Sequence, residues 1–126
     1  MVTIINKRFV EDYREAISGK AKTPELINRY VSDPELLEHI AFFEAAFPKY
    51  ELFADDYVCE DDKVAVRGRF RGVHKGEIMG MPPTNRTVEF PFAIIYRVTD
   101  EKISKSWLFA DMMAIRKQLE VNPNLN

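Results

Sequence analysis

Hydrophobic residues recur with two different periods along this chain of 126 residues. Up to residue 47 they recur about every third or fourth position, which is the spacing of an amphipathic helix. From residue 50 they alternate with polar residues, which is the spacing of a strand with one buried face. The pattern therefore predicts a helical N-terminal part followed by a part rich in strands.

The N-terminal part predicts three helices. The first ends near Gly19, a residue suited to the left-handed position after a helix. The other two begin at the similar sequences TPEL (from Thr23) and DPEL (from Asp33), where a capping oxygen precedes a proline at the first helical position. Pro48 ends the third helix. The first helix is expected to bury Ile5, Phe9, Tyr13 and Ile17 and to expose Lys7, Arg8, Glu11, Asp12, Arg14 and Glu15.

The second part predicts antiparallel strands. Two segments have inward faces made of Val64, Val66, Gly68, Phe70, Gly72 and His74, and of Val88, Phe90, Phe92, Ile94, Tyr96 and Val98. After the turn VTDEKIS, a last strand is expected to place Ile103, Trp107, Phe109 and Asp111 on one face, before DMMAIRKQL returns to a helical period. Helices followed by antiparallel strands predict an α+β fold with the helices on one face of the sheet. The length predicts a single domain, residues 1–126.

Composition and charge exclude several classes of partner. The formal net charge is −2 and the sequence has no basic cluster, so nucleic acid and anionic membranes are not expected to bind. The longest apolar stretches, AFFEAAF and FPFAIIY, are too short to cross a bilayer, and the first residues lack the apolar core of a signal peptide. Cys59 is the only cysteine, so neither an internal disulfide nor a zinc site is expected. We expect a reduced, cytoplasmic protein without a metal.

The strong alternation also predicts where a ligand would bind. A curved sheet with an aromatic inner face, covered by a few short helices, often leaves a hollow that takes a small molecule. The candidate pocket residues are Trp107, Phe109, Tyr96, Phe92 and Phe70, together with His39 at the edge of the third helix. Packing within the core is the alternative role for this aromatic set.

The segment HKGEIMGMPPTNRTVEF, from His74 to Phe90, is unusually rich in special residues for a connection between two strands. Its glycines permit close approaches, and Asn85 tolerates a left-handed backbone. The segment is expected either to form a rim at the open end of the fold or to support helix packing. His74 is expected to point inward, bonded to its own loop, with polarisation of a substrate oxygen as the functional alternative.

Residues 72–119, which begin GVHKGEIMGMPPTNR and contain SWLFAD, resemble the SnoaL-like polyketide cyclases, or ester cyclases. The family pattern is roughly G-x-H-x-G-x-F-x-G-x-P-P-T-G-R, then a strand, then H-W-x-x-x-D. The stretch AAFPKYEL resembles the end of the family's third helix. The resemblance implies the conical fold typified by nuclear transport factor two. In that fold three N-terminal helices pack on a curved antiparallel sheet, and two copies form a homodimer through their sheets.

The same resemblance implies an activity. Characterised members close a ring by an intramolecular aldol condensation on a polyketide ester, without cofactor or metal, and an aspartate at the end of the last strand is the acid/base. That position is Asp111 here. The sequence departs from the pattern at Ser106, in place of a histidine, at Asn85, in place of a glycine, and in the short connection VSDPELLEH.

The role of Asp111 depends on its burial. Beside Trp107 and Phe109 in a closed pocket, desolvation would raise the pKa of its carboxyl group and make it a usable base. In solvent, Asp111 would only cap the helix that follows it. The family pattern favours the pocket, which would then bind a small apolar carbonyl compound. The alternative is a noncatalytic binding or dimerisation module. Epoxide hydrolysis would draw on Asp111 and Arg97 but needs a second inward acid, and steroid isomerisation needs a second, protonated acid; neither acid is evident.

Overall fold

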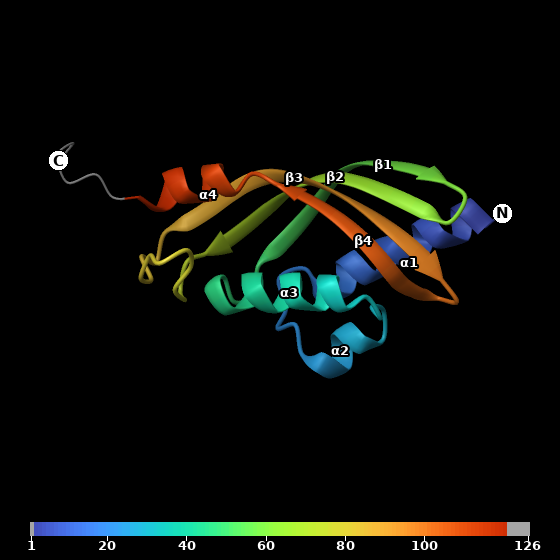
Figure 1. Cartoon of the computed structure of the whole chain (residues 1–126), viewed down its shortest axis with the longest axis horizontal. Helices are drawn as coiled ribbons and strands as arrows, with labels where there is room; N and C mark the ends of the chain where they lie inside the picture. The colour runs from blue at the N-terminus through green and yellow to red at the C-terminus, as the bar shows by residue number, and fades with distance from the viewer. Residues whose placement is uncertain (1, 121–126) are drawn as a thin grey trace.

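The computed structural model describes residues 2–120. Their three N-terminal helices lie on one side of a four-stranded antiparallel sheet, and a fourth helix follows the last strand (Figure 1). In chain order the elements are α1 (Val2–Ile17), α2 (Pro24–Asn28), α3 (Pro34–Ala46), β1 (Glu51–Glu60), β2 (Lys63–Val73), β3 (Thr87–Thr99), β4 (Lys102–Ala110) and α4 (Met112–Leu119). The sheet order is β1-β2-β3-β4. The predicted arrangement of three N-terminal helices on a curved antiparallel sheet is confirmed. Among these helices none is both long enough and apolar enough to cross a membrane.

The predicted helix starts and stops are also confirmed. The Thr23 side chain accepts a hydrogen bond from the Leu26 amide at 3.3 Å, and Asp33 accepts one from the Glu35 amide at 3.2 Å. Gly19 has a φ of 71°, the left-handed conformation expected after α1. The face that α1 buries, however, is rotated from the predicted one. Ile5 is 61% exposed, and Arg14 is buried beside Tyr13.

The inner face of the sheet forms the core with α1 and α3. On β2 and β3 the predicted alternation is confirmed, because every inward residue from Val64 to His74 and from Val88 to Val98 is buried. Helix α3 contributes Ile40 and Phe43 to the same core.

Strand β4 departs from the prediction because of a β-bulge. Arg97 pairs with Lys105, but the next residue, Val98, pairs with Ile103, so β4 carries one extra residue at this point. An extra residue exchanges the two faces of everything that follows it. The predicted inward positions of Trp107 and Phe109 are therefore wrong. Trp107 is half-buried on the outer face of the sheet, and Phe109 is 62% exposed there.

The glycine- and proline-rich connection after β2 supports helix packing. The backbone amides of Lys75 and Gly76 donate to the carbonyl oxygen of Ala46 at 2.9 and 3.1 Å. A Cβ atom at Gly76 would lie 2.0 Å from the carbonyl oxygen of Ala45, so only glycine permits this approach. Asn85 has the expected left-handed backbone, with a φ of 59°. The segment therefore fixes the C-terminal end of α3 against the sheet.

Candidate functional site

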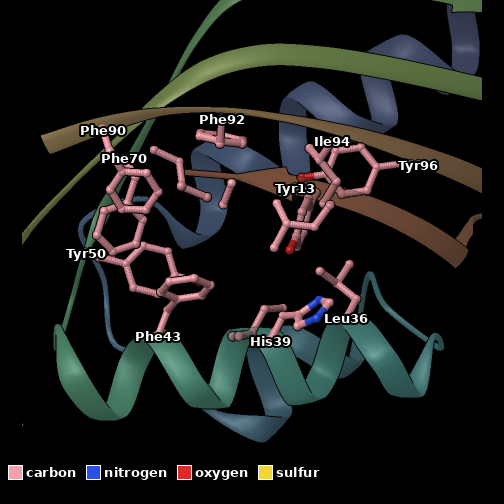
Figure 2. Close-up of a pocket in the computed structure, with 14 residues that line it drawn as sticks. Tyr13, Leu36, His39, Phe43, Tyr50, Phe70, Phe90, Phe92, Ile94 and Tyr96 are labelled. Carbon is pink, nitrogen blue, oxygen red and sulfur yellow. The ribbon is translucent and has the colours of Figure 1, made fainter. Parts of the chain in front are cut away.

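A cavity lies between the inner face of the sheet and helices α1 and α3 (Figure 2). Its volume is about 50 Å³. One water needs roughly 10–15 Å³ and benzene occupies a cavity of about 150 Å³, so this cavity has room for a few waters and takes a ring only if side chains move. Of the predicted pocket residues, Phe70, Phe92, Tyr96 and His39 line this cavity. Trp107 and Phe109 do not, since the bulge turns them outward.

One end of the cavity is a wall of aromatic rings, which we call the aromatic wall and which consists of Phe43, Tyr50, Phe70 and Phe90. The Phe70 ring stacks between those of Tyr50 and Phe90, with centroid distances of 4.8 and 4.6 Å and interplanar angles of 25°. Phe43 reaches the same group from α3, 5.4 Å from Phe70. These side chains offer flat apolar surface to a ligand.

The other end of the cavity is formed by two tyrosines, Tyr13 of α1 and Tyr96 of β3 (Figure 2). Their rings meet edge to face at 5.9 Å. Burial is the largest influence on both hydroxyl groups and raises the pKa of each above its usual value, whereas the nearby Arg14 acts in the opposite direction. Both phenols therefore stay protonated in the folded protein at neutral pH and can donate hydrogen bonds.

Arg14 is the most unusual polar group near the cavity, and the sequence prediction placed it on the exposed side of α1. Its side chain is buried, and its Nη1 donates to the Tyr96 hydroxyl oxygen at 3.1 Å. Its Nε and Nη2 have no hydrogen-bond partner within residues 2–120. The guanidinium also lies 5.3 Å from the centre of the Phe92 ring. The spacing offered a signal that was missed, because Arg14 lies four residues after Val10 and three before Ile17, both fully buried.

His39 brings an imidazole to the cavity from α3 (Figure 2). Its Nδ1 is buried and has no hydrogen-bond partner in the described part of the chain. An imidazole nitrogen in this state can bind a ligand group or exchange a proton with one. No three His, Cys, Asp or Glu side chains within residues 2–120 are grouped as metal ligands.

Asp111 lies outside the cavity. It is exposed and caps α4, where its Oδ1 accepts a hydrogen bond from the Ala114 amide at 2.9 Å. It borders an outer hollow on the far side of Phe92 and Leu108, two residues that also line the cavity. The expectation that its carboxylate faces the cavity is therefore wrong. The bulge reversed the faces of β4, and the start of α4 provides the carboxylate with a backbone donor.

His74 is buried against its own loop, as the structural interpretation predicted. Its Nδ1 accepts a hydrogen bond from the Thr84 amide at 3.2 Å and lies 3.0 Å from the Thr84 hydroxyl oxygen. Its ring packs against Phe47 with centroids 5.7 Å apart. His74 does not line the cavity. These contacts stabilise the loop that supports α3.

Ser106 connects α3 to the sheet. Its hydroxyl donates to Oδ2 of Asp33 at 2.7 Å, and both side chains are buried. Strict alternation with an inward Trp107 would put Ser106 on the outer face, and the bulge explains why it lies on the inner one. Asp33 therefore caps α3 with one oxygen and binds β4 with the other, which fixes the helix that carries His39 above the sheet.

The outer face of the sheet carries arginines that do have acidic partners. Arg69 is bonded to Asp55 at 3.0 Å, and Arg71 to Glu51 at 3.2 Å. Both acidic partners belong to β1. The described structure therefore explains these arginines as surface ion pairs.

Comparisons with known proteins agree with this architecture. The family model described as SnoaL-like polyketide cyclase matches residues 1–119. AclR from Streptomyces galilaeus, a proposed hydroxylase, is 21% identical with a TM-score of 0.79, over 93% of this chain and 96% of that one. IdmH from Streptomyces antibioticus, a proposed polyketide cyclase, is 26% identical with a TM-score of 0.73, over 92% of this chain and 99% of that one. A SnoaL-like polyketide cyclase from Agrobacterium tumefaciens is 20% identical with a TM-score of 0.73, over 91% and 98% of the two chains. No curated protein matches the sequence. The match of the family model over nearly the whole chain shows that this protein belongs to the SnoaL-like polyketide cyclase family.

Proposed function

We propose that the protein binds a small, largely apolar carbonyl compound in the cavity beneath its helices. The observation that carries this proposal is the lining itself: a stacked aromatic wall at one end, and a few polar side chains, Tyr13, Tyr96 and His39, facing the same space. Apolar hollows with few convergent polar groups are the usual form of small-molecule sites. The cavity volume of about 50 Å³ is smaller than the roughly 150 Å³ of a cavity that binds benzene, so a ring compound enters by displacing side chains.

An NMR titration with cyclohexanone and acetophenone tests this binding. Ala110 lines the cavity from β4, so Ala110→Phe would fill it. Ala41 is exposed on α3 and provides a matched control, Ala41→Phe. We expect shift changes at residues of the aromatic wall in the wild type and in Ala41→Phe, and their loss in Ala110→Phe. Equal binding by all three proteins would place the ligand elsewhere and contradict the proposal.

A second candidate function is catalytic: proton transfer next to the ligand carbonyl, in an aldol-type ring closure or an isomerisation. The unpartnered Nδ1 of His39 supports it, because a base must reach the carbon that loses the proton. The resemblance to the family names Asp111 for this role. Its exposure and its bond to the Ala114 amide favour His39 over Asp111 as the base.

Two substitutions distinguish the catalytic candidates from simple binding. Exchange of the α-hydrogens of cyclohexanone with deuterated water can be followed by NMR in wild type, His39→Gln and Asp111→Asn. Loss of exchange only in His39→Gln supports His39, and loss only in Asp111→Asn supports the family role. If the wild type accelerates no exchange, proton transfer from this ketone is excluded, and the binding module remains.

The homodimer through the sheet stays a prediction. Its support is two exposed apolar side chains on the outer face, Phe109 of β4 and Val58 of β1, which are 62% and 65% exposed. Sedimentation of the wild type against Phe109→Lys checks it. Dimer in the first and monomer in the second would support this face as the interface. A wild-type monomer would contradict it.

A further inference from the structure

We propose that Tyr96, polarised by Arg14, is the hydrogen-bond donor that holds the ligand oxygen, and that the cavity therefore selects planar compounds whose oxygen carries negative charge, such as enolates and phenolates. This inference rests on the proposed function, since it places the ligand in the same cavity. It adds the chemical class of the ligand and the group that recognises it.

The direction of the hydrogen bonds at Tyr96 follows from the chemistry of its partner Arg14. Arg14 can only donate, so the Tyr96 oxygen is the acceptor in their 3.1 Å bond. A phenol carries one proton of its own, and within residues 2–120 no acceptor for the Tyr96 proton is found. Because Tyr96 lines the cavity, a ligand oxygen there can accept this proton.

Arg14 carries a positive charge in a buried position. Arg14 is 4% exposed, and within the described residues its guanidinium group has no ion-pair partner. Two carboxylates, those of Glu11 and Glu15, line the open groove between α1 and β1 that Arg14 and Tyr57 also line. Neither glutamate is buried. A cation without a counter-charge strengthens the donor to which it is bonded, because it draws electron density from the phenol oxygen in a region of low dielectric.

The positive charge of Arg14 determines which kind of ligand oxygen suits Tyr96. An isolated buried charge is unfavourable and calls for an opposite charge nearby. Arg14 itself does not line the cavity, so a ligand meets its charge through Tyr96. A donor of this kind is most effective towards an oxygen that becomes negative, as a carbonyl oxygen does when the neighbouring carbon loses a proton. The aromatic wall at the opposite end suits the planar part of such a compound.

The competing explanation is that Arg14 is structural and that its free nitrogens are solvated from the groove between α1 and β1, which it also lines. In that case Tyr96 is an ordinary phenol, and the affinity for an oxygen ligand does not depend on Arg14. The two explanations differ in how affinity responds to the charge on the ligand oxygen, which a structural role would not change.

The test uses the full chain, phenols made progressively more acidic by ring fluorination, and toluene as the isostere of phenol that lacks the oxygen. Dissociation constants are measured by NMR titration for wild type, Arg14→Met and Tyr96→Phe. In the wild type we expect the affinity to rise with the acidity of the phenol. In both variants the dependence should flatten. In Tyr96→Phe, which loses the hydrogen bond to the ligand, phenol should also bind roughly tenfold more weakly. Toluene should keep its affinity within about twofold, because the apolar contacts are unchanged.

Three results would overturn the inference. An unchanged acidity dependence in Arg14→Met would make Arg14 structural, with the proposed binding function intact. An unchanged dependence in Tyr96→Phe, which keeps the ring and the fold even if Arg14→Met does not fold, would place the ligand oxygen at another group. If neither phenol nor toluene shifts any residue of the aromatic wall, the binding function fails together with this inference.

Discussion

Arginines on the outer face of the sheet differ from the arginine beneath its inner face in whether they have a carboxylate partner. On the outer face, where water screens charge, Arg69 and Arg71 both have carboxylate partners on β1. Beneath the sheet, where an unpaired charge is most unfavourable, Arg14 contacts the Tyr96 phenol and the face of Phe92 and has no carboxylate partner among residues 2–120. Stability alone would favour the reverse distribution. The outer pairs are surface ion pairs, and the proposed polarisation of Tyr96 by Arg14 accounts for the unpaired cation beneath the sheet.

The largest difference between the two faces is expected for their aromatic rings. Phe70→Ala removes the middle ring of the aromatic wall and should lower the free energy of unfolding by about 3–5 kcal/mol. Phe109→Ala, on the outer face and 62% exposed, should change it by less than about 0.5 kcal/mol in the monomer. Urea unfolding at low protein concentration measures both. Similar losses in the two variants would contradict the assignment of inner and outer faces on β4.

The bond between Ser106 and Asp33 gives the next largest effect. Ser106→Ala leaves a buried carboxylate oxygen without its donor and should destabilise the protein by about 1–3 kcal/mol. Ser104→Ala, its neighbour at the bulge, loses a more exposed bond to Thr99 and should cost less than about 1 kcal/mol. Thermal unfolding of the two variants provides the comparison. An equal and small loss in both would mean that β4 does not turn Ser106 inward.

The buried tyrosines predict a pH dependence. The pKa values of Tyr13, Tyr50 and Tyr96 are all raised above the usual value of 10.0, chiefly by burial. A raised folded-state pKa means that the stabilisation is complete below pH 10 and is lost as the pH rises further, because the unfolded chain releases its protons first. Each tyrosine should contribute about 1.4 kcal/mol per pH unit in that range.

Lys22 acts in the opposite direction and at lower pH. Burial lowers the pKa of its amine from 10.5, so the stability rises as the pH increases through that lowered pKa to about 10.5. Urea unfolding from pH 8 upward, with tyrosine ionisation followed by absorbance, measures the net effect. Tyr96→Phe should make the decline above pH 10 less steep. Ionisation of all the tyrosines near pH 10 in the folded protein would contradict their burial.

The smallest predicted effect separates the two kinds of arginine. Arg14→Met removes a buried charge without a counter-charge and should leave the protein as stable as the wild type or about 1 kcal/mol more stable. Arg69→Met breaks an exposed pair and should be slightly destabilising or neutral. Paired thermal unfolding experiments give the sign of each. A strong destabilisation by Arg14→Met would mean that its bonds serve the fold.

Much of the fold could be predicted from the sequence, and the reasons are local. The alternation on β2 and β3 is uninterrupted, so it identified Phe70, Phe92 and Tyr96 as inward residues. The caps at Thr23 and Asp33 depend on neighbouring residues only. His39 was placed at the edge of an apolar stripe, and it lines the cavity from that position.

The predictions that failed depend on information that alternation does not contain. A bulge adds one residue at a strand pairing, and nothing within SKSWLFAD marks it. The predicted positions of Trp107, Phe109 and Asp111 all followed from one uninterrupted period. Arg14 was missed for a different reason, because a charged residue on a helix is assigned to solvent by default even where its spacing matches buried neighbours.

A crystal structure of the protein soaked with a fluorinated phenol tests the central claim most directly. We predict a ring against the aromatic wall and an oxygen about 2.5–2.8 Å from the Tyr96 hydroxyl, as a charge-assisted bond requires, with Arg14 still bonded to the same tyrosine. A phenol oxygen bound to His39 instead, or a ring bound beside Asp111 in the outer hollow, would contradict it.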